Sequence, residues 1–247
     1  MLAIIGGSGL TQLANQAIVR REVVRTPYGE PSGPLTFGRI CGQPTVFIAR
    51  HGYGHTIPPH EVNYRANIWA LRHAEATCIV SIASVGGIRA DLGPGTLVIP
   101  HQIIDYTWGR KNTFHEGVDA PVVHIDFTQP YDAEMRRLLL QAAHDSGQAV
   151  TDGAVYAATQ GPRLESAAEI DRLERDGADI VGMTGMPEAA LAREMELPYA
   201  AITVVANHAA GRGDSANGIR FASLEDILRE SMERVRRIIE MICLGDT

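Results

Sequence analysis

Cysteine is scarce in this chain. The three cysteines, Cys41, Cys78 and Cys243, are odd in number, widely spaced and without a CxxC pair. Such a set favours neither a disulfide framework nor a zinc site. We therefore expect a protein of the reducing cytoplasm that holds no metal.

Basic residues and long apolar runs are also lacking. The 22 Lys and Arg are outnumbered by 29 Asp and Glu, which gives a formal net charge of -7. A nucleic-acid surface normally needs a clustered basic face. No apolar run approaches the roughly 20 residues of a membrane-spanning helix, and MLAIIGGSGL lacks the basic flank and cleavage site of a signal peptide. We expect neither nucleic acid nor a membrane as a partner.

The chain does have the material for one globular domain over residues 1–247, with 45% hydrophobic and 21% charged residues. Short β-branched runs alternate with longer helical patterns, which is typical of parallel strands joined by crossover helices. The pattern predicts an α/β fold, a single domain whose central mixed, mostly parallel sheet is flanked by helices. The predicted strands are Leu2–Ile5, Pro44–Arg50, Cys78–Ser84, Thr96–Ile104, Ala154–Thr159, Ile180–Met183 and Tyr199–Ala206. The predicted helices are Glu61–Ala74, Ala133–Ser146, Ala167–Asp176, Pro187–Glu196 and Leu224–Cys243.

Capping patterns predict where two of these helices begin. Ser166 with Glu169, and Ser223 with Asp226, each have the spacing of a capping box. The polar stretch 210–220, with three glycines, is expected to be a mobile loop and is a candidate lid.

Four short segments, far apart in the chain, offer donors for a phosphate or a purine. They are GGSGL at 6–10, RHGYGH at 50–55, ASVGG at 83–87 and GMTGMPE at 182–188. An inorganic phosphate dianion needs several donors that converge from different directions, and one glycine-rich turn specifies little. Most of these segments follow a predicted strand. Because ligands of α/β folds bind beyond the carboxyl ends of strands, we expect the segments to share one site.

Arg50 and His51 stand at the end of an apolar strand. We expect the guanidinium fork to grip two phosphate oxygens while the imidazole donates another hydrogen bond. Two alternatives stay open. His51, His55 and His60 are also a candidate metal cluster, although the adjacent arginine would repel a cation. The first glycine-rich turn is also compatible with a dinucleotide fold, but the last glycine of that fingerprint is missing.

These blocks and their order resemble the trimeric nucleoside phosphorylase family, which includes purine nucleoside phosphorylase and methylthioadenosine phosphorylase. The matching blocks, spread over nearly the whole chain, are IIGGSGL, IARHGYGHTIPPHEVNYRANIWAL, SVGGIRADLGPGTLVIP, TQGPRLES and GMTGMPEAALARE. The resemblance implies a homotrimer that binds a nucleoside and the co-substrate inorganic phosphate, with no metal or organic cofactor. It implies that phosphate is contacted by Ser8, Arg50, His51, Ser84 and Thr184, and the ribose by Met183.

At the purine end the chain departs from the methylthioadenosine enzymes of that family. Their TDYD-like segment, whose aspartate reads a 6-amino group, is matched here by ANHA at 206–209. The Asn207 amide can donate to a 6-oxo oxygen and accept from N7–H, and Glu165 matches a glutamate that accepts from N1–H in 6-oxopurine enzymes. The alternatives are that Glu165 only caps a helix and Asn207 only satisfies a turn. Leu164 replaces an aromatic residue, so weaker base stacking is expected.

At the sugar end, inosine phosphorylases of the family offer a histidine to the 5'-hydroxyl, but residues 219–224 contain none. Leu224 aligns near that position, and its apolar surface would prefer a methylthio group to a hydroxyl. His124 matches a histidine that, in the methylthio enzymes, reaches in from the adjoining subunit. The alternative for His124 is a surface imidazole.

Together these features predict phosphorolysis of 5'-methylthioinosine to hypoxanthine and 5-methylthioribose 1-phosphate. Positioning and charge complementarity carry the reaction: Asn207 stabilises the charge on the departing purine, Glu165 fixes the ring and His51 holds phosphate. A methylthioadenosine phosphorylase, a broader inosine and guanosine phosphorylase, a nucleoside hydrolase and a catalytically silent purine-binding protein stay open as alternatives.

Overall fold

The computed structural model describes residues 1–117, 121–219 and 224–245, which build one mixed sheet of eleven strands. Six of its ten strand pairings are parallel and four are antiparallel. The strands are β1 Leu2–Gly6, β2 Ala17–Glu22, β3 Leu35–Ile40, β4 Gln43–Ala49, β5 Cys78–Gly87, β6 Leu97–Ile99, β7 Gln102–Asp105, β8 Thr151–Asp152, β9 Val155–Ala158, β10 Ile180–Gly182 and β11 Tyr199–His208. The helices are α1 Tyr64–His73, α2 Ala133–Asp145, α3 Ala167–Arg175, α4 Gly185–Glu194 and α5 Leu224–Gly245, with a 3-10 turn η1 at Gly213–Ser215. The predicted α/β fold with a mixed, mostly parallel sheet flanked by helices is confirmed.

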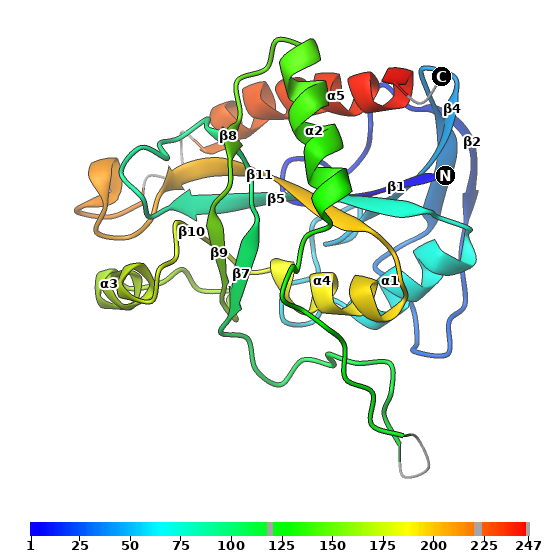
Figure 1. Ribbon diagram of the computed structural model, residues 1–247, viewed down its shortest axis with the longest axis horizontal. Coiled ribbons are helices and arrows are strands. Elements are labelled where there is room, and N and C mark those ends of the chain that lie inside the picture. The colour runs from blue at the N-terminus through cyan, green and yellow to red at the C-terminus, as the bar shows by residue number, and fades with distance from the viewer. Residues whose placement is uncertain (118–120, 220–223, 246–247) are drawn as a thin grey trace.

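The sheet is covered by helices on both faces. Helices α1 and α4 pack on one face and α2 and α5 on the other, as Figure 1 shows. Because successive residues of a strand point to opposite faces, Ile5 of β1 packs among the residues of the α1 and α4 side. Its neighbour Ile4 belongs to the core on the α2 and α5 side. Both side chains are fully buried, so β1 is fixed in the middle of the sheet.

All seven predicted strands form, but residues 96–104 make two strands instead of one. Strand β6 ends at Ile99 and β7 begins at Gln102. Pro100 lies between them, and because it has no backbone N–H it ends the ladder of β6. The chain then changes partners: β6 pairs with β11, whereas β7 pairs with β9.

Three strands, β2, β3 and β8, were not predicted. All six residues of β2 are exposed, so the alternation of apolar and polar residues that marks a half-buried strand is missing. Strand β8 has only two residues, too few to leave a periodic pattern. Strand β3 is held between β2 and β4 by antiparallel pairing, which lies far from the site.

Helix ends and loops bear out one of the capping predictions. The capping box of Ser166 and Glu169 is present at the start of α3 and is confirmed. The second box includes Ser223, which lies outside the described residues. Within the stretch predicted as a mobile loop, residues 213–215 form η1, and Ser215 is buried.

A long connection, residues 106–132, joins β7 to α2. Its described part has neither strand nor helix and extends away from the sheet (Figure 1). None of the helices in the described residues has the length and apolar character needed to cross a bilayer.

Candidate active site

A cavity of about 530 Å³ lies where the carboxyl ends of the parallel strands β1, β4, β5 and β11 meet. Strand β10, antiparallel to β5, brings a further wall to it. The volume is in the range that small-molecule sites occupy, so a nucleoside with a phosphate can be accommodated. Ten of the eleven predicted site residues line the cavity: Ser8, Arg50, His51, Ser84, Leu164, Glu165, Met183, Thr184, Asn207 and Leu224. The segments predicted to share one site therefore do so.

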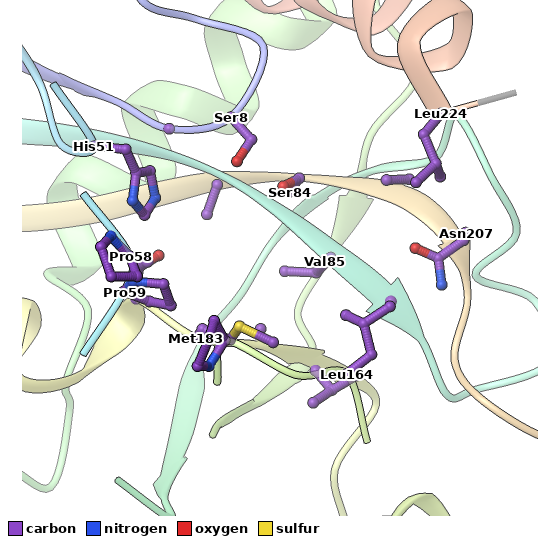
Figure 2. A pocket seen from close by; sticks show the side chains of 18 of the residues that line it. Ser8, His51, Pro58, Pro59, Ser84, Val85, Leu164, Met183, Asn207 and Leu224 are labelled. Carbon is purple, nitrogen blue, oxygen red and sulfur yellow. The ribbon is translucent and has the colours of Figure 1, made fainter. Parts of the chain in front are cut away.

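The cavity has two chemically different ends. Figure 2 shows the side chains of Ser8, His51 and Ser84 at one end and those of Leu164 and Asn207 at the other. The first end holds hydroxyl and imidazole groups, which suit a small anion. The second end combines an apolar side chain with an amide, which suits a flat heterocycle.

Arg50 lies in the wall of the anion end but is already engaged. Its Nε donates to Glu188 Oε2 at 2.6 Å and its Nη2 to Glu188 Oε1 at 2.8 Å. Nη2 also donates to Ser81 Oγ, and Nη1 donates to the carbonyl of Ile82. The guanidinium has five N–H groups, so one hydrogen on Nη1 is left for a ligand. The prediction that the fork grips two phosphate oxygens is wrong, because Glu188 occupies the fork.

His51 also differs from the prediction. Its Nδ1 lies 2.8 Å from the carbonyl oxygen of Ile57, and since a carbonyl only accepts, Nδ1 carries the hydrogen. Burial, followed by the positive charge of Arg50, lowers the pKa of His51 from 6.5 to about 4. At neutral pH the ring therefore has a single N–H, which is spent on Ile57. The expectation that this imidazole donates to phosphate is wrong for the neutral ring, whose Nε2 can only accept.

Three hydroxyl groups complete the anion end. The Ser8 hydroxyl is 2.9 Å from His55 Nε2. Ser84 belongs to β5, and Thr184 is the residue before α4, where its side chain makes no capping hydrogen bond to the helix. A hydroxyl can both donate and accept, so these groups can adapt to either kind of phosphate oxygen.

Two polar side chains at the far end each have one atom fixed by a neighbour. Asn207 Nδ2 donates to the carbonyl of His208 at 2.6 Å, which leaves Oδ1 and one N–H for a ligand. Glu165 Oε1 accepts from the hydroxyl of Thr159 at 2.6 Å, which leaves Oε2 available. Both residues line the same cavity as Arg50, so the prediction of a single shared site survives this test.

Apolar side chains surround the remaining space. The Met183 side chain lies against Gly161, where an added Cβ would come within 2.3 Å of its sulfur. Leu164, on the strand-to-helix connection before α3, is 38% exposed and free to cover a ligand. A second apolar wall is formed by Ile219, Leu224 and Leu228. The uncertain placement of Leu224 at the site was therefore sound, although what it contacts stays a prediction.

His124 is the one predicted site residue outside the cavity. It is exposed on the long connection between β7 and α2. Its expected contact is with a neighbouring subunit, which a single chain does not test, so this role stays a prediction.

Three residues that support the site were missed. Glu188 lies inside the GMTGMPE block, and a carboxylate one helical turn after Thr184 was the available signal. Thr159 ends a predicted strand six residues before Glu165. Arg110 left no signal: it donates to the carbonyls of Met183 and of residues 159 and 160, and so ties two walls of the cavity together.

A metal centre finds no support in the described ranges, 1–117, 121–219 and 224–245: no group of three or more His, Cys, Asp or Glu side chains is arranged to hold an ion. The His51 and His55 rings face each other edge to face at 5.1 Å, while His60 lies nearest Glu61. The cluster weighed as a metal site is thus not assembled.

Fold and site together define an α/β enzyme whose single cavity has an anion end, a purine-compatible end and an apolar wall. The chain belongs to the phosphorylase superfamily, whose family model matches residues 1–243.

Individual relatives are similar over almost the entire chain. A probable S-methyl-5'-thioinosine phosphorylase of Pseudomonas syringae pv. tomato is 50% identical over 240 residues, which are 97% of both chains. A probable 6-oxopurine nucleoside phosphorylase of Thermococcus kodakarensis is 42% identical over 243 residues, 96% of this chain and 90% of the relative. Among solved structures, methylthioadenosine phosphorylase from Schistosoma mansoni in complex with adenine superimposes with a TM-score of 0.94 at 32% identity, covering 100% of this chain and 92% of the other.

Proposed function

We propose that this chain is a glycosyltransferase that cleaves S-methyl-5'-thioinosine with inorganic phosphate, releasing hypoxanthine and 5-methylthioribose 1-phosphate. One observation carries the proposal. The acceptors Asn207 Oδ1 and Glu165 Oε2 share a cavity with the anion end at Ser8 and His51 and with the apolar wall at Leu224.

The free atoms of Asn207 and Glu165 favour a 6-oxopurine. Glu165 Oε2 accepts from the N1–H of hypoxanthine, whereas adenine presents a bare N1 lone pair there. The second N–H of Asn207 can donate to O6. An adenine nucleoside would leave Glu165 without a donor, which costs about 1 to 3 kcal/mol, or roughly tenfold or more in preference.

The apolar wall of Ile219, Leu224 and Leu228 favours a methylthio group at the 5' position. A 5'-hydroxyl placed against these side chains would lose its hydrogen bonds to water without replacement. Sulfur and methyl lose nothing comparable and bury apolar surface instead. The same wall therefore disfavours inosine and guanosine.

The chemistry follows from positioning and charge complementarity. An unprotonated phosphate oxygen bonds to the anomeric carbon as the glycosidic C–N bond breaks and its electron pair moves onto the purine. The purine takes up one proton and the phosphate P–OH group gives one up, so the products are neutral hypoxanthine and a sugar phosphate dianion. Asn207 Oδ1 accepts from the N7–H that develops, while Glu165 fixes the ring.

The relatives support the same assignment. Those named probable S-methyl-5'-thioinosine phosphorylase are about as similar as 50% to 53% identical, ahead of the 42% of a 6-oxopurine phosphorylase and the 32% of a methylthioadenosine phosphorylase. We further propose a cytoplasmic homotrimer in which His124 serves the site of a neighbouring subunit. No metal or organic cofactor enters the proposed reaction, and phosphate is a co-substrate.

The test is to incubate the protein with phosphate and, in turn, S-methyl-5'-thioinosine, methylthioadenosine or inosine, and to measure the released base. The proposal expects the thioinosine to be cleaved at least tenfold more efficiently than either other nucleoside, and only when phosphate is present. Faster cleavage of methylthioadenosine or inosine would replace the substrate assignment. Phosphate-independent cleavage would make the protein a hydrolase, and tight hypoxanthine binding without turnover would make it a purine-binding protein.

A further inference from the structure

The imidazole of His51 has only one polar atom left for a ligand. Its Nδ1 is bound to the Ile57 carbonyl at 2.8 Å, which fixes the hydrogen on that nitrogen. Nε2 has no hydrogen-bond partner among the described residues, and it is not one of the fully buried polar atoms that lack a partner. Because His51 lines the cavity, the lone pair of Nε2 is available to a bound anion. A lone pair attracts a hydrogen and repels a bare oxyanion.

The positive charge beside this lone pair is largely balanced. The Arg50 side chain is completely buried, and Glu188, 1% exposed, binds it through both carboxylate oxygens. Only one Nη1 hydrogen of Arg50 remains, directed toward the turn at Gly7, where an added Cβ would lie 2.9 Å from Nη1. The anion end therefore attracts negative charge only moderately. Its preference among anions must come from matching individual hydrogen bonds.

We propose that this site selects tetrahedral oxyanions that carry a hydroxyl group, and that His51 Nε2 makes the selection by accepting a hydrogen bond from that group. Hydrogen phosphate meets the requirement and sulfate does not. The inference rests on the proposed function only in taking the anion end as the phosphate site. The remaining oxygens of hydrogen phosphate then face the hydroxyls of Ser8, Ser84 and Thr184 and the last N–H of Arg50.

This arrangement also orients the nucleophile. Because the P–OH oxygen is held at His51, the oxygens available to attack the sugar are the unprotonated ones. A sulfate in the same position would bring an oxygen lone pair against the Nε2 lone pair. Since sulfate and hydrogen phosphate are both tetrahedral dianions at mildly alkaline pH, the proton is the feature that distinguishes them.

The experiment measures binding of four anions to the native enzyme by calorimetry at mildly alkaline pH, with hypoxanthine present. Phosphate and arsenate carry a hydroxyl group, whereas sulfate and selenate, their partners in size, do not. We expect phosphate and arsenate to bind roughly tenfold or more tightly than sulfate and selenate, because each unprotonated anion leaves a lone pair unmatched. Equal affinities within either pair would overturn the proposal.

A variant locates the effect at His51. Glutamine has both a donor and an acceptor, so His51→Gln can turn its amide toward either kind of anion. We expect the ratio of phosphate to sulfate affinity to fall toward one in this variant. The exposed His60, on the same segment but outside the cavity, supplies the control His60→Gln, in which the ratio should stay as in the native enzyme. A His51→Gln variant that weakens both anions equally would show a structural role and contradict the assignment.

A second measurement does not depend on any variant. Long-range proton–nitrogen NMR spectra of the native enzyme distinguish the two neutral tautomers of histidine. A His51 ring protonated on Nε2 would overturn the proposal. All these readouts are independent of nucleoside turnover, so failure of the methylthioinosine assignment and failure of the anion selection are separate results.

Discussion

Arg50 and Glu188 form a buried ion pair in which both carboxylate oxygens receive hydrogen bonds, at 2.6 and 2.8 Å. Burial alone would lower the pKa of Arg50, but the charge and hydrogen bonds of Glu188 outweigh it and raise the pKa above its ordinary value. Glu188 also accepts from Ser81 Oγ and from the hydroxyl of Tyr199. The arginine of the RHGYGH block is thus held in one orientation by a residue 138 positions later in the chain.

The first prediction concerns this pair. Glu188→Gln keeps the side-chain shape but leaves the Arg50 cation buried without its counter-charge. Removing one partner of a buried pair is expected to lower the free energy of unfolding by about 3 kcal/mol or more. Urea denaturation measures it, with Glu230→Gln, an exposed glutamate on α5, as the control. Equal stability of the two variants would contradict the structural importance of the pair.

The strands that frame the site could be predicted because each ends in a recognisable motif. Runs of β-branched residues lead directly into Gly7, Arg50 and Ser84, and the carboxyl ends of parallel strands meet at one edge of a sheet. The apolar wall could be predicted in part, since Leu224 begins a strongly periodic helix. These features depend on residue type and local pattern, which a sequence carries.

The hydrogen-bonding state of the site residues could not be predicted. His51 was expected to donate because imidazole can, but the Ile57 carbonyl consumes its hydrogen. Arg50 was expected to offer its fork, but Glu188 fills it. Both outcomes depend on which atoms the tertiary fold brings within hydrogen-bond distance, and the sequence does not specify those distances.

The second prediction follows from the lowered pKa of His51. The ring titrates near 6.5 when unfolded and at about 4 when folded, so between these values the unfolded chain binds a proton that the folded chain does not. Stability should therefore be constant above about pH 6.5 and should fall as the pH drops toward 4, by about 3 kcal/mol in total from this group. Urea unfolding between neutral pH and about pH 5 measures the slope. His51→Gln should show a shallower slope, and an unchanged slope would contradict the burial of a neutral ring.

The third prediction tests the purine end. In Asn207→Asp, a carboxylate oxygen replaces the amide nitrogen that donates to the His208 carbonyl at 2.6 Å, so the side chain must be protonated or turn away. We expect kcat/KM for methylthioinosine to fall at least roughly tenfold, and methylthioadenosine to gain relative to it. Asn217→Asp, an exposed change outside the cavity, is the control. Unchanged kinetics with both nucleosides would remove Asn207 from base recognition.

The fourth prediction tests the apolar wall. Leu224→His introduces a hydrogen-bonding group beside Leu228 at the end of the cavity assigned to the 5' substituent. We expect the ratio of kcat/KM for inosine to that for methylthioinosine to rise roughly tenfold, because a 5'-hydroxyl then finds a partner. Ile18→His, at a half-exposed position on β2, should leave the ratio unchanged. No change in Leu224→His would place the 5' group elsewhere in the cavity.

The last prediction tests whether Glu165 acts in an orientation that its neighbour sets. Thr159→Val is nearly isosteric and removes only the hydroxyl that donates to Glu165 Oε1 at 2.6 Å. A hydrogen bond to a charged group contributes about 1.5 to 3 kcal/mol, so kcat/KM for methylthioinosine should fall roughly tenfold or more and discrimination against methylthioadenosine should shrink. The KM for phosphate should not change, because the anion end does not involve Thr159.

The matched control is Thr107→Val, which removes a threonine hydroxyl that donates to the carboxylate of Asp105 outside the cavity. This variant should retain native kinetics with both nucleosides. If Thr159→Val raised the KM for phosphate as much as it lowered kcat/KM for the nucleoside, the change would report a general distortion of the cavity. An unaltered preference between the two nucleosides would mean that Glu165 reads the base without the help of Thr159.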